Sequence, residues 1–483
     1  MKLIYGIHDK PKFGQTLVFA FQQMIAIMAA TLLVPMLMNG MSGGSLYFDP
    51  AAALFGAGAG TIIYLLFTKR RSPVFLGSSF TFLGAYAAVI GANYGYWGVI
   101  IGVAFAGLVY VVIALIIKLV GSGWINKLMS PVIIGPIVTL IGLSLSSTAT
   151  GWMSSNGGSS YSLLWILVGA LTFLAIAWTS VKGTKMMKLI PFIIGIGFGY
   201  VVALCFTGVG YIIENAAENA EFEKALKMIA VAEEFKMVSF QPFIDTFKPF
   251  TFRSVVDVPE FTIVNAFKQG FDLIDGKAIA NIALTFVPIG IVELAQHMAD
   301  HKNLSNIVEQ DLITDPGMHR TLLGDGVGSI VGAIFGGAAN TTYGESIGCV
   351  AITKNASIVS IFWAAIGCLV LSFFSPFVAV INSIPKCVMG GACIAMYGFI
   401  AVSGLQMLKL VDLNDNKNLY VVASILVTGI GGLALNFGTN KFTGGGLISF
   451  GGLATALIIG LITNVIVNFM PGFKSNEETD KQE

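Results

Sequence analysis

Charged residues are scarce in this chain of 483 residues: Asp, Glu, Lys and Arg together make up 11%. A soluble domain carries roughly 25% charged residues, so this chain cannot cover a water-facing surface. Hydrophobic residues make up 55%, and the mean hydropathy is +0.82. The sequence therefore indicates a membrane protein. Its formal net charge of +1 gives no sign of a nucleic-acid partner.

Cysteine and histidine are also rare. Five cysteines lie in apolar stretches without metal-ligand spacing, so we expect packing residues and no disulfide framework: Cys205, Cys349, Cys368, Cys387 and Cys393. The four histidines form no HExxH or Ser-His-Asp pattern, which disfavours a membrane-embedded enzyme, and we expect no metal and no cofactor. The stretch DLITD (311–315) spaces two carboxylates like a metal motif, but Pro-Gly follows and indicates a loop.

Long apolar runs are abundant. A spanning helix needs about 20 mostly apolar residues, and two further apolar segments, 74–90 and 338–353, are short and interrupted. Together they predict an all-α polytopic protein with fourteen segments. The longer runs are 14–38, 49–68, 96–120, 127–149, 160–181, 187–206, 279–299, 319–337, 356–380, 386–405, 417–437 and 446–470. The polar start precedes a run too long for a signal peptide, so no cleavable signal is expected.

Basic residues in the short loops predict the orientation. With the N-terminus inside, the cytoplasmic side collects eighteen Lys and Arg residues, whereas the short outer loops hold only Lys386 and Lys441. We therefore expect a multi-pass protein of the inner (plasma) membrane with both termini cytoplasmic. The stretch 207–278 would lie outside. It holds eleven acidic and seven basic residues and two amphipathic runs, which predict a partly helical loop or cap.

The two halves of the chain resemble each other weakly. Residues 21–26 (FQQMIA) resemble 295–299 (AQHMA), and 77–80 (GSSF) resemble 340–343 (NTTY). The shared order predicts two repeats of seven segments, and an odd number of segments requires opposite orientations. The expected parts are a first repeat (1–206), an outer loop (207–278), a second repeat (279–470) and a cytoplasmic tail (471–483).

The interrupted segments 73–91 and 336–354 each begin in a β-prone pattern and then become compatible with a helix. Non-helical backbone at membrane depth must find partners inside the protein or line a cavity. The two segments could pair as short antiparallel strands and direct two half-helix N-termini at a polar solute. The alternative is a pair of kinked, Gly-rich helices. Glu345, early in the second segment, indicates a functional carboxylate or a structural ion pair.

The eighth segment carries a polar stripe. Glu293, Gln296, His297 and Asp300 fall at i, i+3, i+4 and i+7, which is one face of a helix. In an apolar membrane helix such a face should meet the protein interior or a water path, where its members titrate or form hydrogen bonds. We expect His301, next to Lys302, simply to mark the cytoplasmic end.

At these residues a family resemblance becomes specific. The segments 75–84 (FLGSSFTFLG), 311–320 (DLITDPGMHR), 340–348 (NTTYGESIG), 384–391 (IPKCVMGG) and 396–404 (MYGFIAVSG) resemble the nucleobase–ascorbate transporter family and its bacterial uracil permease branch. The resemblance covers essentially the whole chain apart from 207–278 and the tail. It implies two inverted seven-segment repeats, a core and a gate domain, a homodimer in the lipid bilayer, and uracil import by proton symport through alternating access.

The resemblance also implies roles for individual residues. The Phe80 ring would stack on a flat base, Tyr343 and Gly344 would offer backbone contacts, and Glu345 would accept hydrogen bonds from ring N–H groups. Tyr397 would face the site from the gate side.

Gln296 departs from the family pattern. Uracil-type members have a carboxylate there, followed by His-x-Gly and then His or Asp, and this pattern falls on residues 296–300. A glutamine still donates and accepts hydrogen bonds but carries no titratable proton. We expect proton coupling to pass to Asp300, with Glu293 as the second candidate and His297 and Glu345 as further titratable groups. The departure also leaves xanthine or another oxo-purine open as the substrate.

Two other classes of transporter remain for comparison. A sulfate-carrier-like anion transporter shares the overall architecture but should place basic residues or bare helix N-termini at its centre, and the intramembrane carboxylates argue against it. A channel is disfavoured because broken helices with a titratable stripe suit alternating access better than a continuous pore.

Overall fold

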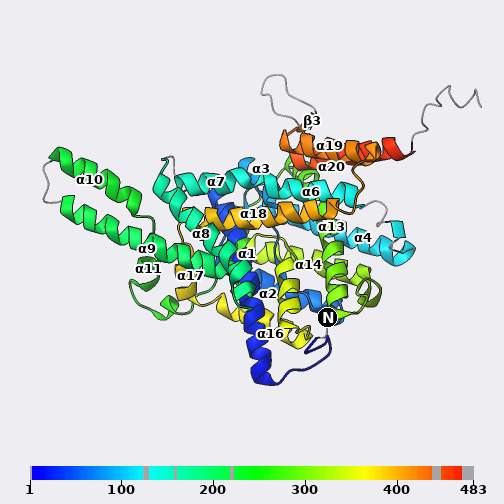
Figure 1. Cartoon of the computed structure of the whole chain (residues 1–483), viewed down its shortest axis with the longest axis horizontal. Coiled ribbons are helices and arrows are strands. Elements are labelled where there is room, and N and C mark those ends of the chain that lie inside the picture. Colours follow the sequence, from blue (N-terminus) through cyan, green and yellow to red (C-terminus); the bar gives the residue numbers. More distant parts are fainter. Residues whose placement is uncertain are drawn as a thin grey trace, which may run out of the picture.

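A computed structural model describes residues 3–121, 123–124, 130–156, 160–185, 187–217, 222–437 and 448–469. These residues form a bundle of helices from which α9 and α10 project together at one end (Figure 1). Eight of the described helices are long and apolar enough to cross a membrane. The expected tail 471–483 lies outside the described residues.

Helices occupy both expected repeats. The first half contains α1 (Phe13–Ser42), α2 (Pro50–Phe67), α3 (Leu83–Gly91), α4 (Gly95–Val120), α6 (Pro131–Ser144), α7 (Ser146–Ser155), α8 (Leu163–Lys182) and α9 (Pro191–Ala217). The second contains α13 (Gly276–Val308), α14 (Met318–Gly336), α15 (Gly344–Thr353), α16 (Ile358–Leu371), α17 (Ser375–Asn382), α18 (Lys386–Leu408), α19 (Asn416–Ile430) and α20 (Gly452–Phe469).

Local sequence signals explain several helix starts. The Asp49 side chain accepts the N–H of Ala51, and Pro50 occupies the first helical position of α2, where its missing N–H costs nothing. Ser162 caps α8 and Asp275 caps α13 in the same way.

The interrupted segments pair as antiparallel strands, which confirms the prediction. Strand β1 (Leu76–Ser78) pairs with β2 (Asn340–Thr342), with Gly77 opposite Thr341. All six residues are buried. The pairing satisfies backbone groups that lipid could not, and it joins the two halves of the chain. Each strand is followed by a short helix, α3 or α15.

The segment between the repeats is partly helical, as expected. Helix α9 extends past residue 206 to Ala217, and α10 (Phe222–Phe235) folds back along it (Figure 1). Shorter helices follow: α11 (Gln241–Phe247), the 3-10 turn Phe252–Ser254 and α12 (Thr262–Gln269).

Two expected spans near the C-terminus are shorter than predicted, and this part of the prediction is wrong. Instead of continuing to 437, α19 ends at Ile430, and β3 (Leu435–Phe437) pairs with β4 (Ile448–Phe450) before α20 begins at Gly452. The backbone at Gly432 has φ +66°, which ends helical geometry at little cost only for glycine. The apolar content of this stretch outweighed its glycines in the prediction.

The helices pack in two groups. The first, which we call the core group, contains α1–α4 and α13–α16, and the second, the gate group, contains α6–α9 and α18–α20. Close backbone approach holds the core group together: a Cβ on Gly107 of α4 would lie 2.7 Å from the Gly326 carbonyl oxygen of α14. The paired strands lie inside the core group beside α1, α2 and α14.

Candidate functional site

A cavity of about 390 Å³ lies where the paired strands and α13 of the core group face α6, α9 and α18 of the gate group. Five of the six residues predicted to bind a solute line it: Phe80, Gln296, Tyr343, Gly344 and Glu345. The other wall residues are Ser79, Thr81, Val138, Phe192, Ala299, Asp300, Thr341, Met396, Phe399, Ile400, Ser403 and Met407. The cavity is thus a mostly apolar slot with a few polar groups, as small-molecule sites are.

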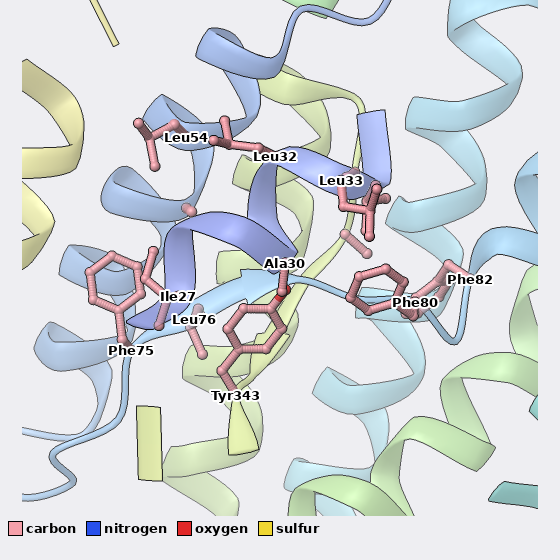
Figure 2. Packing of buried hydrophobic residues seen from close by; sticks show 14 of the residues in the cluster. Ile27, Ala30, Leu32, Leu33, Leu54, Phe75, Leu76, Phe80, Phe82 and Tyr343 are labelled. Atoms are coloured by element: carbon pink, nitrogen blue, oxygen red, sulfur yellow. The ribbon is translucent and has the colours of Figure 1, made fainter. Parts of the chain in front are cut away.

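The residues that follow β1 and β2 contribute aromatic rings and backbone N–H groups to the wall. Phe80 follows β1, and Tyr343 follows β2 directly before α15 (Figure 2). The Tyr343 hydroxyl donates to the Ser78 carbonyl oxygen at 2.9 Å, which fixes the ring against β1. Helix α15 begins at Gly344, and the N–H groups of a first helical turn have no partners within their helix. They are therefore available to a polar solute beside Glu345.

The α13 part of the wall is polar. Gln296 and Asp300 lie one turn apart and both line the cavity. The Asp300 carboxylate accepts a hydrogen bond from the Thr342 hydroxyl at 3.0 Å, which ties α13 to β2. A change in the charge of Asp300 would therefore act directly on the strand that carries Tyr343 and Gly344.

Glu293 lies one turn deeper, behind the wall. Its side chain is buried, and Oε1 accepts the Ser79 hydroxyl at 3.2 Å. Ser79 itself lines the cavity, so Glu293 reaches the site through one intervening side chain. Among the described residues, its second oxygen Oε2 has no hydrogen-bond partner.

The polar stripe divides between two environments. Gln296 and Asp300 face the cavity, whereas His297 turns into the core group. There its Nδ1 lies 2.6 Å from the Asp325 carboxylate of α14, and its Nε2 lies 2.9 Å from the Thr321 hydroxyl. The His297 and Asp325 side chains are fully buried.

Tyr397 is the one predicted binding residue that does not line the cavity. Its ring instead makes an edge contact with the Phe80 ring, with the centroids 6.2 Å apart. Helix α18 places other side chains on the wall, including Met396, Phe399 and Ser403. A contact of Tyr397 with a solute would therefore be indirect, through Phe80.

Comparison with known proteins identifies the family. A model described as "Permease family" matches residues 14–437. The uracil permease of Bacillus caldolyticus is 35% identical over 477 residues, which cover 98% of this chain and 97% of the relative. The chain belongs to this permease family. The family is the one that the motifs resemble, so the protein is a transporter and not an enzyme.

Further relatives agree along nearly the full length. The uracil permease of Bacillus subtilis (strain 168) is 36% identical and covers 96% of this chain and 95% of the relative. The uracil permease of Escherichia coli (strain K12) is 29% identical, with coverage of 95% and 94%.

Solved structures share the fold. The transmembrane domain of a cyanobacterium bicarbonate transporter, BicA, aligns with TM-score 0.51 and 13% identity over 95% of this chain and all of that one. The murine anion transporter Slc26a9 in the inward-facing state aligns with TM-score 0.51 and 12% identity, over 95% of this chain and 69% of that one. At this identity the likeness shows the fold alone: a helical, multi-span membrane protein.

His301 of the permease does not mark the helix end, so that expectation is wrong. It is buried, its Nε2 lies 2.8 Å from the Tyr64 hydroxyl, and its Nδ1 lies 2.9 Å from the His297 carbonyl oxygen. Helix α13 continues to Val308, two turns beyond it. Lys302 beside it suggests a boundary in the sequence, but Tyr64 of α2 contacts the His301 side chain, which is buried.

Asp325 is a buried polar residue that the sequence reasoning missed. It lies in the middle of an apolar, Gly-rich span, and a carboxylate at such a position is itself a signal for a functional or paired group.

The DLITD loop of the permease uses its carboxylates within the protein. Asp311 accepts hydrogen bonds from the Thr314 hydroxyl and from the Ile313 N–H, and the Thr314 bond is the main reason that the pKa of Asp311 lies below its ordinary value. The Arg71 Nη1 donates to both carboxylate oxygens of Asp315, at 2.7 and 2.8 Å. Among the described residues no cluster of three or more His, Cys, Asp or Glu side chains could hold a metal ion.

Proposed function

We propose that this permease imports uracil across the plasma membrane by proton symport. The observation that carries the proposal is the cavity itself: one aromatic wall, the first turn of α15 and two carboxylates meet at the strand pair of a chain similar to uracil permeases throughout its length. A flat, neutral solute with several hydrogen-bonding groups needs these features, and an analogue that leaves buried partners unpaired is rejected.

The wall residues divide the recognition of the base. Phe80 stacks on the ring of the base, and Tyr397 supports Phe80 from the gate group. Glu345 accepts a ring N–H, the N–H groups at the start of α15 meet a ring carbonyl, and Gln296 offers a donor and an acceptor. Because Gln296 is not a carboxylate, an oxo-purine such as xanthine is the alternative substrate.

The proton is carried by α13. Asp300 faces the cavity and accepts a hydrogen bond from Thr342 of β2. Its protonation state therefore affects this hydrogen bond and the position of β2 beside the base. Glu293 is the second candidate because Ser79 connects it to the wall. His297 and Asp325 form a buried pair that holds α13 against α14 during the cycle.

Alternating access completes the proposal. Fourteen segments form two inverted repeats (1–206 and 279–470), the core group moves against the gate group, both termini are cytoplasmic, and 207–278 lies outside. Two copies form a homodimer. An anion substrate of the sulfate-carrier type fits poorly, because the described residues of the cavity wall include Asp300 and Glu345 and no Lys or Arg.

Uptake of labelled uracil and labelled xanthine by cells lacking their own permeases, with and without a protonophore, tests the proposal. We expect uracil to accumulate and the protonophore to abolish accumulation. Preferential accumulation of xanthine would change the substrate, and failure to take up either base would overturn the functional proposal.

A further inference from the structure

A second cavity, of about 350 Å³, lies between α3, the beginning of α13 and the beginning of α20. Its wall includes Gly84, Ala88, Ala92, Tyr94, Asn281 and Thr285. Among the described residues, it shares none with the wall of the first cavity, which we call the substrate cavity. Gly84, Ala88 and Ala92 recur every four residues, so α3 borders this space with small side chains. We call this space the outer cavity, because the proposed topology places the start of α13 on the outer side.

The two cavities lie along one surface of the core group. On α13, Asn281, Thr285 and Ile289 line the outer cavity, and Gln296 and Asp300 line the substrate cavity. Steps of four, four, seven and four residues keep these side chains on one helical face. At 1.5 Å per residue, Asn281 and Gln296 are separated by about 22 Å along the axis.

An apolar contact separates the cavities. Val292, between Ile289 and Gln296, belongs to a buried cluster with Ile137 and Ile141 of α6 and Leu457 of α20. The core group is therefore sealed against the gate group between the two spaces. A solute that passes along α13 from the outer cavity to the substrate cavity would have to part this contact.

The polar groups of the outer cavity match one kind of ligand. The Asn281 Nδ2 donates to the Tyr94 hydroxyl at 3.2 Å, and the tyrosine keeps its own O–H proton for another acceptor. The Asn281 Oδ1 is buried and has no hydrogen-bond partner among the described residues, which costs stability unless a ligand supplies a donor. The site thus offers one acceptor beside one donor. A cyclic amide presents the complementary pair, an N–H next to a carbonyl.

We propose that the outer cavity is a separate binding site where the arriving nucleobase pauses, held through its N–H and carbonyl edge by Asn281 and Tyr94. The inference rests on the proposed import of a nucleobase. Val292 and its partners then act as the outer barrier between this site and the substrate cavity. The small side chains of α3 keep the space open for a flat ring.

Filling the outer cavity tests the proposal. Ala88→Trp places a large ring into it, whereas Ala87→Trp, on the neighbouring exposed position that does not line it, is the matched control. We expect uracil uptake by Ala88→Trp to fall about tenfold or more because the route is blocked, while uracil binding at the substrate cavity of the purified protein in detergent keeps its wild-type Kd. Ala87→Trp should take up uracil as the wild type does.

A second pair of variants tests the polar contact without bulk. Asn281→Leu and Tyr94→Phe should each raise the uracil concentration for half-maximal uptake about threefold to tenfold, since one neutral hydrogen bond contributes roughly that factor. The Kd for uracil at the substrate cavity of the purified variants should match that of the wild type. A merely structural role would instead lower the melting temperature and the amount of protein without changing the concentration dependence.

Accessibility gives an independent measurement. In Ala88→Cys, a membrane-impermeant methanethiosulfonate added outside cells should stop uptake, and uracil should slow the modification. The treated wild type sets the baseline for the native exposed Cys205. Wild-type uptake by both Ala88→Trp and modified Ala88→Cys would overturn this inference alone. Failure of the wild type to bind and take up uracil would overturn the proposed function and this inference with it.

Discussion

At the scale of single residues, the character of the substrate cavity depends on which side chains of α13 face it. Gln296 and Asp300 face the cavity, and Glu293 and His297 do not, although the four residues share one stripe in the sequence. Asp300 is therefore the α13 carboxylate in direct reach of a solute. Glu345, in the first turn of α15, supplies the other wall carboxylate. Substrate recognition and proton transfer can therefore use different residues.

Glu345→Gln should lose base affinity while leaving the fold intact. The amide still fits the wall, but it replaces a charged acceptor, and hydrogen bonds to charged groups contribute about 1.5–3 kcal/mol, or roughly tenfold to hundredfold in Kd. Binding of labelled uracil to the purified protein measures the effect. Asp272→Asn, on an exposed loop, is the control. An unchanged Kd in Glu345→Gln would remove Glu345 from the site.

Asp300→Asn should uncouple the proton from the base. We expect the variant to bind uracil and to exchange internal for external uracil, but to lose accumulation and its dependence on external pH, because the amide carries no titratable proton. Uptake measured at external pH values from acid to neutral reports proton-coupled accumulation. A counterflow measurement reports the exchange of internal for external uracil. Glu293→Gln is the comparison variant. Full proton-driven accumulation in both would contradict a coupling role for α13.

At the scale of elements, the strand pair β1–β2 positions the residues that we propose to bind the base. It brings Phe80 and Tyr343, which are far apart in the chain, to one wall, and Figure 2 shows both rings among buried side chains of α1 and β1. The Tyr343 ring lies directly over Gly77, where any Cβ would collide with it. A glycine is required at this point of β1 because of that close approach.

Gly77→Ala should therefore damage both stability and binding. The new methyl group must push the Tyr343 ring or separate the strands, and overpacking of this kind costs about 1–3 kcal/mol. We expect a lower melting temperature and weaker uracil binding. Gly91→Ala, at the end of α3 where a Cβ meets nothing within 4 Å, is the matched control and should stay near the wild type. Equal melting temperatures for the two variants would argue against the packing described.

At the scale of the whole molecule, the cavity lies between the core group and the gate group. Val292 of α13 and Ile137 of α6 share one buried apolar cluster that joins the groups. If the groups must move relative to each other in each cycle, a covalent link across this contact should arrest transport. A link within one group should not.

In a variant without the five native cysteines, a bifunctional thiol reagent on Val292→Cys/Ile137→Cys should therefore stop uptake, and reduction should restore it. Ile425→Cys/Gly460→Cys, where α19 and α20 of the gate group touch, is the control pair. Cross-linked Val292→Cys/Ile137→Cys that still transports would contradict movement between the groups.

The family resemblance supplied six residues expected to bind a solute, and five of them line the cavity. The sequence alone determined the membrane class, most of the helical segments and the two strand-forming interruptions. These features follow from local properties: apolar runs long enough to cross a bilayer, and residue patterns that cannot remain helical at membrane depth. Its errors also were local. The predicted span to 437 ignored glycines that end α19, and His301 was judged by its neighbour Lys302.

Only the tertiary structure decided which way each polar side chain turns. A stripe with helical spacing identifies one broad face, but two partners cover that face. Asp300 therefore meets the cavity, whereas His297 meets Asp325 of the following helix, α14. The same holds for Tyr397, which packs behind Phe80 rather than on the wall, and for the outer cavity, whose three walls come from separate segments. Spacing in one segment cannot specify such contacts, because they depend on the helix that packs opposite.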